Sequence, residues 1–299
     1  MEYILMAVSI LFSTANSTLL RRFKSRTFKT PGDVFLFNGG VSFIWMFILL
    51  ICYFSSNETK ISFETVVYGA VYGLILSMFL YFKTEALACG PVSLTTLAGS
   101  AAFVIPTWFG VVYASEPISV FQLVGVCLIL VSLFMCIDPK VSGETLSLKW
   151  IIYSISFFFT GGFVGILYKV FGGSDVSDQV NAMMLIASIV SASVFFLIGF
   201  FVNHVAKKGA PRIHKDAVLY ILLSGITGCV YIRMNLSLAN MIPSAVFFPV
   251  SNGAMVLLAA LAGTVFFGEK CNRMQTIGIA LGLLAIIITG CGNYLWQLL

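Results

Sequence analysis

The sequence predicts an all-α, polytopic membrane protein whose chain crosses a bilayer ten times. Hydrophobic residues make up 59% of the 299 residues and charged residues only 10%, whereas soluble proteins carry about 45–50% apolar and about 25% charged residues. The hydrophobic residues form continuous runs near the length of about 20 residues that a helix needs to cross hydrocarbon. These runs do not alternate as barrel strands do. A soluble protein is therefore excluded.

Ten runs of this kind are recognised, joined by short connections that hold most turn and charged residues. They cover residues 3–20, 34–54, 65–82, 92–113, 118–137, 150–168, 180–202, 217–238, 244–267 and 274–296. The longest connections are 138–149 and 203–216, and neither is long enough for a soluble domain.

The first half of the chain gives five of these helices. The run 3–20 is expected to remain in the protein, because a secretory signal carries its positive charges before the apolar stretch, whereas Arg21 and Arg22 follow it here. The third run contains Gly69-x-x-x-Gly73, a pair of small residues that lets two helices approach closely. The fourth run contains Pro106, which is expected to interrupt it.

The second half gives the other five. Gly161-x-x-x-Gly165 and Gly278-x-x-x-Gly282 repeat the small-residue pattern in the sixth and tenth runs, and Pro249 is expected to interrupt the ninth. Gly278 and Gly282 could also mark a dimer contact, so a monomer and a homodimer both remain open.

Loop charges predict the orientation. With the connections numbered one to nine, the odd ones carry 14 of the 17 Lys and Arg residues, the even side carries Lys60 and Lys169, and Arg233 lies within a run. Cytoplasmic loops are enriched in Lys and Arg. We therefore expect a multi-pass cell-membrane protein with cytoplasmic odd loops and both termini outside.

An internal repeat divides the chain into two five-helix halves, residues 1–140 and 150–299. At an offset of 153, Glu116 meets Glu269, Gly110 meets Gly263 and Gly125 meets Gly278. An odd number of helices in each half puts the halves in opposite orientations, which is a building plan of secondary transporters. The sequence therefore predicts two inverted repeats with a solute site between them.

These motifs resemble the drug/metabolite transporter superfamily, in its EamA-like branch. The resemblance is carried by Leu80–Pro91 with Ser115-Glu116-Pro117, by Tyr231–Pro243 with Gly268-Glu269-Lys270, and by the Gln and Gly that follow each Glu: Gln122, Gly125, Gln275 and Gly278. It spans essentially the whole chain and implies a ten-helix transporter, in a family that carries many solutes. Members usually have cytoplasmic termini, whereas the loop charges here predict external ones.

Charged residues inside membrane helices are costly and by default functional. All 12 acidic residues fall at predicted helix ends or in loops, so a proton-coupled exporter of organic cations is disfavoured. Arg233 is a candidate ligand for a carboxylate or phosphate, although it could instead reach the headgroups or pair with Glu85. Lys83 and Lys169 are weaker candidates. Glu116 and Glu269 are expected to accept hydrogen bonds from the first amides of the helix that follows each of them.

Amides and hydroxyls in apolar helices are the remaining candidate ligands, because lipid cannot satisfy them. The alternative is that they hold helices together by hydrogen bonds. The proposed substrate-binding set is Asn16, Asn38, Arg233, Asn235 and Asn252, with Thr14, Ser100, Tyr231, Lys83 and Lys169 as weaker members.

Other classes of function are less well supported. Seven scattered cysteines without a C-x-x-C pair and only two histidines predict no metal, no cofactor and no catalytic constellation. The basic clusters lie between apolar runs, so no nucleic acid is expected. The leading hypothesis is a secondary transporter of a small polar neutral or anionic metabolite, such as an amino acid, organic acid or sugar. A nucleotide-sugar or organophosphate exchanger, a channel and a non-transporting membrane sensor remain as alternatives.

Overall fold

The computed structural model describes residues 1–24, 31–56, 61–89, 92–136, 147–204, 215–267 and 272–297, and within these ranges it is all-helical, without a strand. Its helices are α1 (Glu2–Lys24), α2 (Pro31–Ser55), α3 (Phe63–Cys89), α4 (Val92–Ala101), α5 (Val104–Val112), α6 (Val120–Met135), α7 (Leu148–Gly172), α8 (Val180–His204), α9 (Lys215–Met241), α10 (Ser244–Phe267) and α11 (Arg273–Gln297).

The all-helical, polytopic part of the prediction is confirmed. Within the described residues, seven helices are long and apolar enough to cross a membrane, namely α2, α3 and α7 to α11. The predicted run 92–113 differs, because it forms two short helices separated by a turn at Ala102 and Phe103. Pro106 has no N–H to give to the carbonyl four residues earlier, which belongs to Ala102, and the Ile105 amide takes that carbonyl instead at 3.2 Å.

Two other details were wrong. The third run was expected to end at residue 82, but α3 continues to Cys89, so that Lys83 and Glu85 lie inside the helix. The side chain of Glu85 is buried, with 8% exposure, so the charged residues in the sequence do not mark the end of this helix. Pro249 was expected to interrupt its helix, but α10 is continuous through it.

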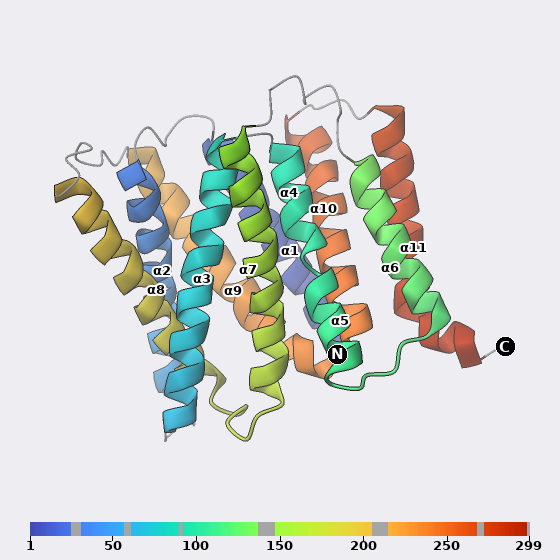
Figure 1. The fold of residues 1–299 in the computed structure, drawn as a ribbon, viewed down its shortest axis with the longest axis horizontal. Helices are drawn as coiled ribbons and strands as arrows, with labels where there is room; N and C mark the ends of the chain where they lie inside the picture. Colours follow the sequence, from blue (N-terminus) through green and yellow to red (C-terminus); the bar gives the residue numbers. More distant parts are fainter. Residues whose placement is uncertain are drawn as a thin grey trace.

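The helices run up and down between two ends of the bundle (Figure 1). α1 begins and α11 finishes at the lower end in this view, together with the α2–α3, α5–α6, α7–α8 and α9–α10 junctions. We call this the terminus end. The helix ends that flank the odd-numbered connections lie at the opposite end, so the sequence segments rich in Lys and Arg leave the bundle on one side.

Helix packing pairs the first half of the chain with the second. α1 packs on α9 and α3 packs on α7, while α2 packs on α8 and α6 on α11. α9 contacts α1, α2, α7 and α10, and α10 contacts α1, α4, α5, α6, α9 and α11. Helices far apart in sequence are therefore the main neighbours.

Small residues allow the closest of these contacts. Gly69 and Gly73 face α8, where an added Cβ would lie 2.8 Å from the Met183 carbonyl oxygen and 2.6 Å from that of Ala187. Gly278 and Gly282 face α6, next to Met135 and Ser132, and the Ser132 hydroxyl donates to the Gly278 carbonyl at 2.6 Å. These glycines therefore allow close packing between helices of the same chain. The face of Gly278 and Gly282, which was suggested as a dimer contact, is covered by α6.

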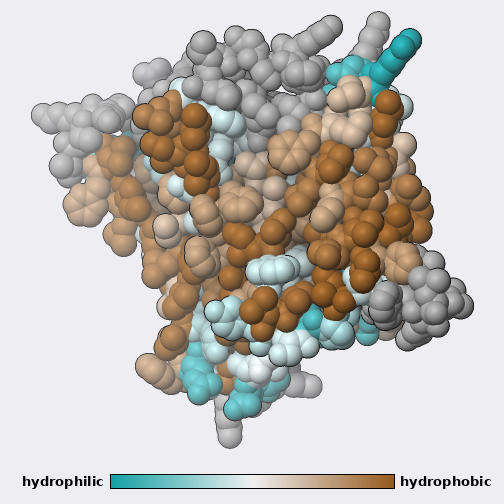
Figure 2. Space-filling model, turned by 45° about the vertical axis from the view of Figure 1, so that its right-hand side comes forward, coloured by the Kyte–Doolittle hydropathy of each residue, from teal (hydrophilic) through white to brown (hydrophobic). Residues whose placement is uncertain are grey.

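Large apolar side chains cover the outside of the bundle. Figure 2 shows a broad hydrophobic band across the visible face, with hydrophilic side chains gathered below it. Leu197 on α8 and Ile287 on α11 are 61% and 60% exposed. A contiguous apolar surface of this kind is what hydrocarbon requires.

The glycine contact between α3 and α8 can be tested directly. Gly73→Ala should lower the melting temperature of the purified protein, because the new methyl group meets backbone atoms that cannot rotate away; overpacking of this kind costs about 1–3 kcal/mol. Gly290→Ala is the matched control, since nothing lies within 4 Å of a Cβ at that helical position. Equal melting temperatures for the two variants would contradict the packing described here.

Candidate functional site

The polar residues of α9 form the centre of the candidate site. Arg233 lies eight residues before the end of α9, about 12 Å along the helix axis. Its Nε donates to Asn181 Oδ1 on α8 and its Nη1 donates to the Ser237 hydroxyl, both at 2.9 Å.

The partners of Arg233 are neutral. A guanidinium has five N–H donors, and these bonds use two of them. Among the described residues no carboxylate forms an ion pair with Arg233, and Glu85 is not its partner. The arrangement orients the guanidinium without neutralising its charge, which leaves it able to bind an anion.

Asn235 and Tyr231 connect α9 to α1. The Ser9 hydroxyl donates to Asn235 Oδ1 at 2.5 Å and approaches the Tyr231 carbonyl oxygen at 3.5 Å. Asn16, further along α1, donates through Nδ2 to the Ser224 carbonyl and to the Thr227 hydroxyl, each at 3.0 Å. These amides hold α1 against α9.

The other predicted side chains are satisfied locally or have no partner. Asn38 Nδ2 donates to the Thr84 hydroxyl at 3.2 Å and so joins α2 to α3. Thr14 and Asn252 donate to carbonyls in their own helices, those of Ile10 and Phe248. Some of the predicted side chains therefore hold helices together, and others lie on α9. The predicted side chains do not form one hydrogen-bonded cluster.

Two predicted residues have no hydrogen bond within the described part of the chain. Ser100, near the end of α4, is 1% exposed and its hydroxyl has no partner there. Lys83 is half-buried on α3, and no ion pair or hydrogen bond to a described residue involves it. Both remain candidates for contact with a solute.

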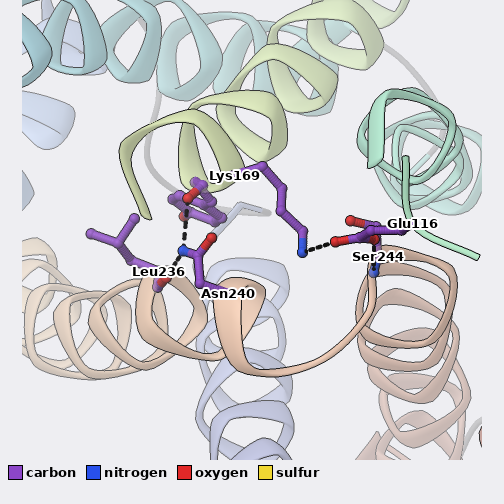
Figure 3. A network of polar contacts seen from close by, with 6 residues as sticks. Glu116, Lys169, Leu236, Asn240 and Ser244 are labelled. Atoms are coloured by element: carbon purple, nitrogen blue, oxygen red, sulfur yellow. Dashed lines mark hydrogen bonds and ion pairs between the residues drawn. The ribbon is translucent and has the colours of Figure 1, made fainter. Parts of the chain in front are cut away.

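Lys169 has a protein partner that the sequence did not suggest (Figure 3). Its Nζ lies 2.6 Å from Glu116 Oε1, and the side chain is only 8% exposed. The other oxygen, Glu116 Oε2, accepts from the backbone amide of Ser244 at 2.6 Å. Glu116 was expected to cap the helix that follows it in sequence. It caps α10 in the other half of the chain, while α6 is capped by Ser119 and Gln122. Glu269 lies outside the described residues.

Further hydrogen bonds extend this network along α7. Asn240 on α9 donates to the Tyr168 carbonyl at 2.9 Å, and the Tyr168 hydroxyl lies 3.2 Å from the Tyr72 hydroxyl on α3. Sequence reasoning missed both contacts. Tyr72 has no polar neighbour in the sequence to draw attention to it, and only the packing of α3 on α7 brings the two rings together.

Electrostatics keep Glu116 ionised. Burial by itself would raise the pKa of the Glu116 carboxyl, but the hydrogen bonds from Lys169 and the Ser244 amide outweigh it, and the pKa lies below its ordinary value of 4.5. Among the described residues no group of His, Cys, Asp and Glu is arranged to hold a metal ion. The chemistry offered by the site is recognition of a polar or anionic group.

Comparison with known proteins identifies a fold and no activity. No family model matches the chain, and no curated protein matches it. A solved structure described only as "Crystal structure of protein" superposes with a TM-score of 0.75 over 96% of this chain and 95% of that one, at 12% sequence identity. At this level of identity the likeness concerns the fold alone.

The Glu116 contact gives a pH-dependent stability. A carboxyl whose pKa is lowered in the folded state stabilises the fold at higher pH and loses that contribution as pH falls through the lowered pKa. Glu116→Gln should therefore melt below the wild type at pH 7, and the gap should narrow as pH falls below 4.5. Glu64→Gln, at an exposed position at the start of α3, is the control. A gap that stays constant from pH 7 to pH 3 would contradict the assignment.

Proposed function

We propose that this chain is a secondary transporter that moves a small polar neutral or anionic metabolite by alternating access. The observation that carries the proposal is Arg233, a cation inside a membrane-spanning helix whose described partners are Asn181 and Ser237. An unneutralised charge at that depth is costly and needs a reason. An anionic group on the solute supplies one.

The transporter proposal includes an inverted repeat, as in the EamA-like branch of the drug/metabolite transporter superfamily. Reciprocal packing supports it: if α1 corresponds to α7 and α3 to α9, then the contact of α1 with α9 is the counterpart of that between α7 and α3, and both exist. The contacts of α2 with α8 and of α6 with α11 would then lie on the axis relating the halves.

Residue contacts on this axis are reciprocal as well. Ser42 and Ser191 are separated by 149 residues, and their buried hydroxyls are 2.9 Å apart. At the sequence offset of 153, Gly125 corresponds to Gly278 and Cys136 to Thr289. Gly125 packs against Thr289, and Gly278 packs against Cys136.

Helix capping repeats at the same offset. Ser119 and Gln122 form a reciprocal capping box at the start of α6. Asn272 and Gln275, 153 positions later, exchange the same two hydrogen bonds at 2.9 and 2.8 Å at the start of α11. Capping boxes are common at helix starts, but these two recur at the same offset as the glycine pairs, which supports duplication of one five-helix unit.

Among possible solutes of such a transporter, one with a carboxylate or a neutral polar group fits this site better than a phosphate ester. Lys169 is neutralised by Glu116. Apart from Lys149 and Arg273, which are exposed in the first turns of α7 and α11, this leaves Arg233 and Lys83 as the basic groups in the described membrane-spanning helices that form no ion pair. A doubly charged phosphate is usually met by more positive charge or by bidentate pairs.

The orientation proposed is external termini and cytoplasmic odd connections. In a variant without native cysteines, cysteines at Arg21 and Arg212 should react only with reagent on the cytoplasmic side, and a cysteine at Ser177 only with reagent outside. Labelling of Arg21 and Arg212 positions from opposite sides would contradict the paired arrangement of the halves.

The Arg233 assignment is tested by uptake into proteoliposomes from a panel of labelled amino acids, organic acids and sugars. Arg233→Leu should insert normally but lose uptake of the transported anion by about 10–100-fold, because a charged hydrogen bond contributes about 1.5–3 kcal/mol. Arg273→Leu, at an exposed position at the start of α11, should keep it. Full uptake by Arg233→Leu would refute the assigned role.

A further inference from the structure

A buried polar contact lies at the terminus end of the bundle, where α7, α9 and α10 meet. Its components are the Lys169 ammonium and the first backbone amide of α10, that of Ser244. α10 is 24 residues long, so its free amides and dipole favour a negative charge at this point. Both groups converge on one carboxylate.

Burial makes this more than a surface ion pair. The Lys169 side chain is 8% exposed and that of Ser244 is fully buried. The Ser244 hydroxyl lies beside the carboxylate but has no well-formed hydrogen bond of its own. A buried cation, a helix amide and an unused hydroxyl together make a complete set of donors for a carboxylate.

The backbone opposite α10 is shaped to admit the carboxylate. Gly110 on α5 faces the position, and a Cβ there would collide with the Ser244 side chain and come within 2.9 Å of Glu116 Oε2. The absence of a side chain at this residue is what leaves room for two oxygens between Lys169 and the start of α10.

The Glu116 carboxylate comes from a segment with an unusual backbone conformation. Ser115, directly before Glu116, has a φ of 53° and is the one non-glycine residue with positive φ among those described. A residue with a side chain adopts this conformation only at a cost in free energy. The Glu116 amide folds back to the Gly110 carbonyl at 3.1 Å. This backbone conformation sets the point from which the Glu116 side chain reaches Lys169 and the start of α10.

We propose that Lys169 and the start of α10 form a carboxylate-binding subsite, which Glu116 occupies in this conformation as a tethered stand-in and which accepts a solute carboxylate when the 113–119 segment withdraws. The subsite rests on the proposed function and deepens it, because it gives an anionic solute a second binding position besides Arg233. Asn240 supports it by tying α9 to the Tyr168 carbonyl, next to Lys169 in α7.

The test is rescue of a vacated site by a free carboxylate. Glu116→Ala should lower the melting temperature of the purified protein in lipid nanodiscs. Potassium acetate should then raise it by about 3 °C at tenfold excess over the dissociation constant, whereas potassium chloride at equal ionic strength should not. Glu116→Ala combined with Lys169→Ala should lose the acetate response.

Ser119→Ala is the matched control, because it removes the cap of α6 in the same connection without opening an anion site. It should melt earlier and gain nothing from acetate. Glu116→Gln covers the case in which the alanine variant does not fold. Its neutral amide competes weakly for Lys169, so acetate should stabilise it more than it stabilises the wild type.

Equal effects of acetate and chloride, or an acetate response that survives removal of Lys169, would overturn the subsite. So would the absence of any response in both Glu116 variants. The melting experiment reads binding alone, so loss of transport with intact rescue would refute the transporter while leaving the subsite in place.

Discussion

Hydrocarbon cannot hydrogen-bond, and the rest of this structure depends on that constraint. Inside the bundle nearly every amide and hydroxyl must find a partner in the chain, and most do. Asn16 and Ser9 join α1 to α9, Asn38 joins α2 to α3, and the hydroxyls of Ser42 and Ser191 meet where α2 crosses α8. The contacts of Asn16, Ser9 and Ser42 link helices from the two halves of the chain, so the pairing of polar groups and the packing of the helices depend on each other. A polar or charged group inside the bundle whose hydrogen bonds or charge are not satisfied by the described residues is the best evidence for function.

Two positive charges illustrate the difference between structure and function. Lys169 has a carboxylate partner at 2.6 Å, which neutralises it and couples α7 to the start of α10. Arg233 has only the oxygens of Asn181 and Ser237 among the described residues. The charge of Lys169 is balanced by Glu116, whereas the Arg233 guanidinium is held in place by neutral groups that leave its charge unbalanced. The solute site proposed around α9 follows from that contrast, and the Glu116 contact adds a place where the chain itself imitates an anionic solute.

Hydrophobic runs predicted the all-helical, multi-pass architecture well, because apolar length is a local property that lipid imposes directly. They failed where the signal was not local. α3 continues past Lys83 and buries Glu85, and that burial depends on neighbours elsewhere in the chain. Pro106 breaks its helix and Pro249 does not, although both stand inside apolar runs. Asparagines at similar depth could not be divided into ligands and helix ties without knowing which helices pack together. The Glu116 contact with Lys169 joins positions 53 residues apart, and no spacing rule predicts such a pair.

The central claim is that two oppositely oriented five-helix units carry a solute between them by exposing one site to each side in turn. Counterflow in proteoliposomes tests it most directly. Vesicles loaded with excess unlabelled solute and diluted into a trace of the labelled form should accumulate the label transiently above equilibrium, at a rate that saturates with solute concentration. Label that only equilibrates, with a rate linear in concentration, would be the behaviour of a channel and would contradict the claim.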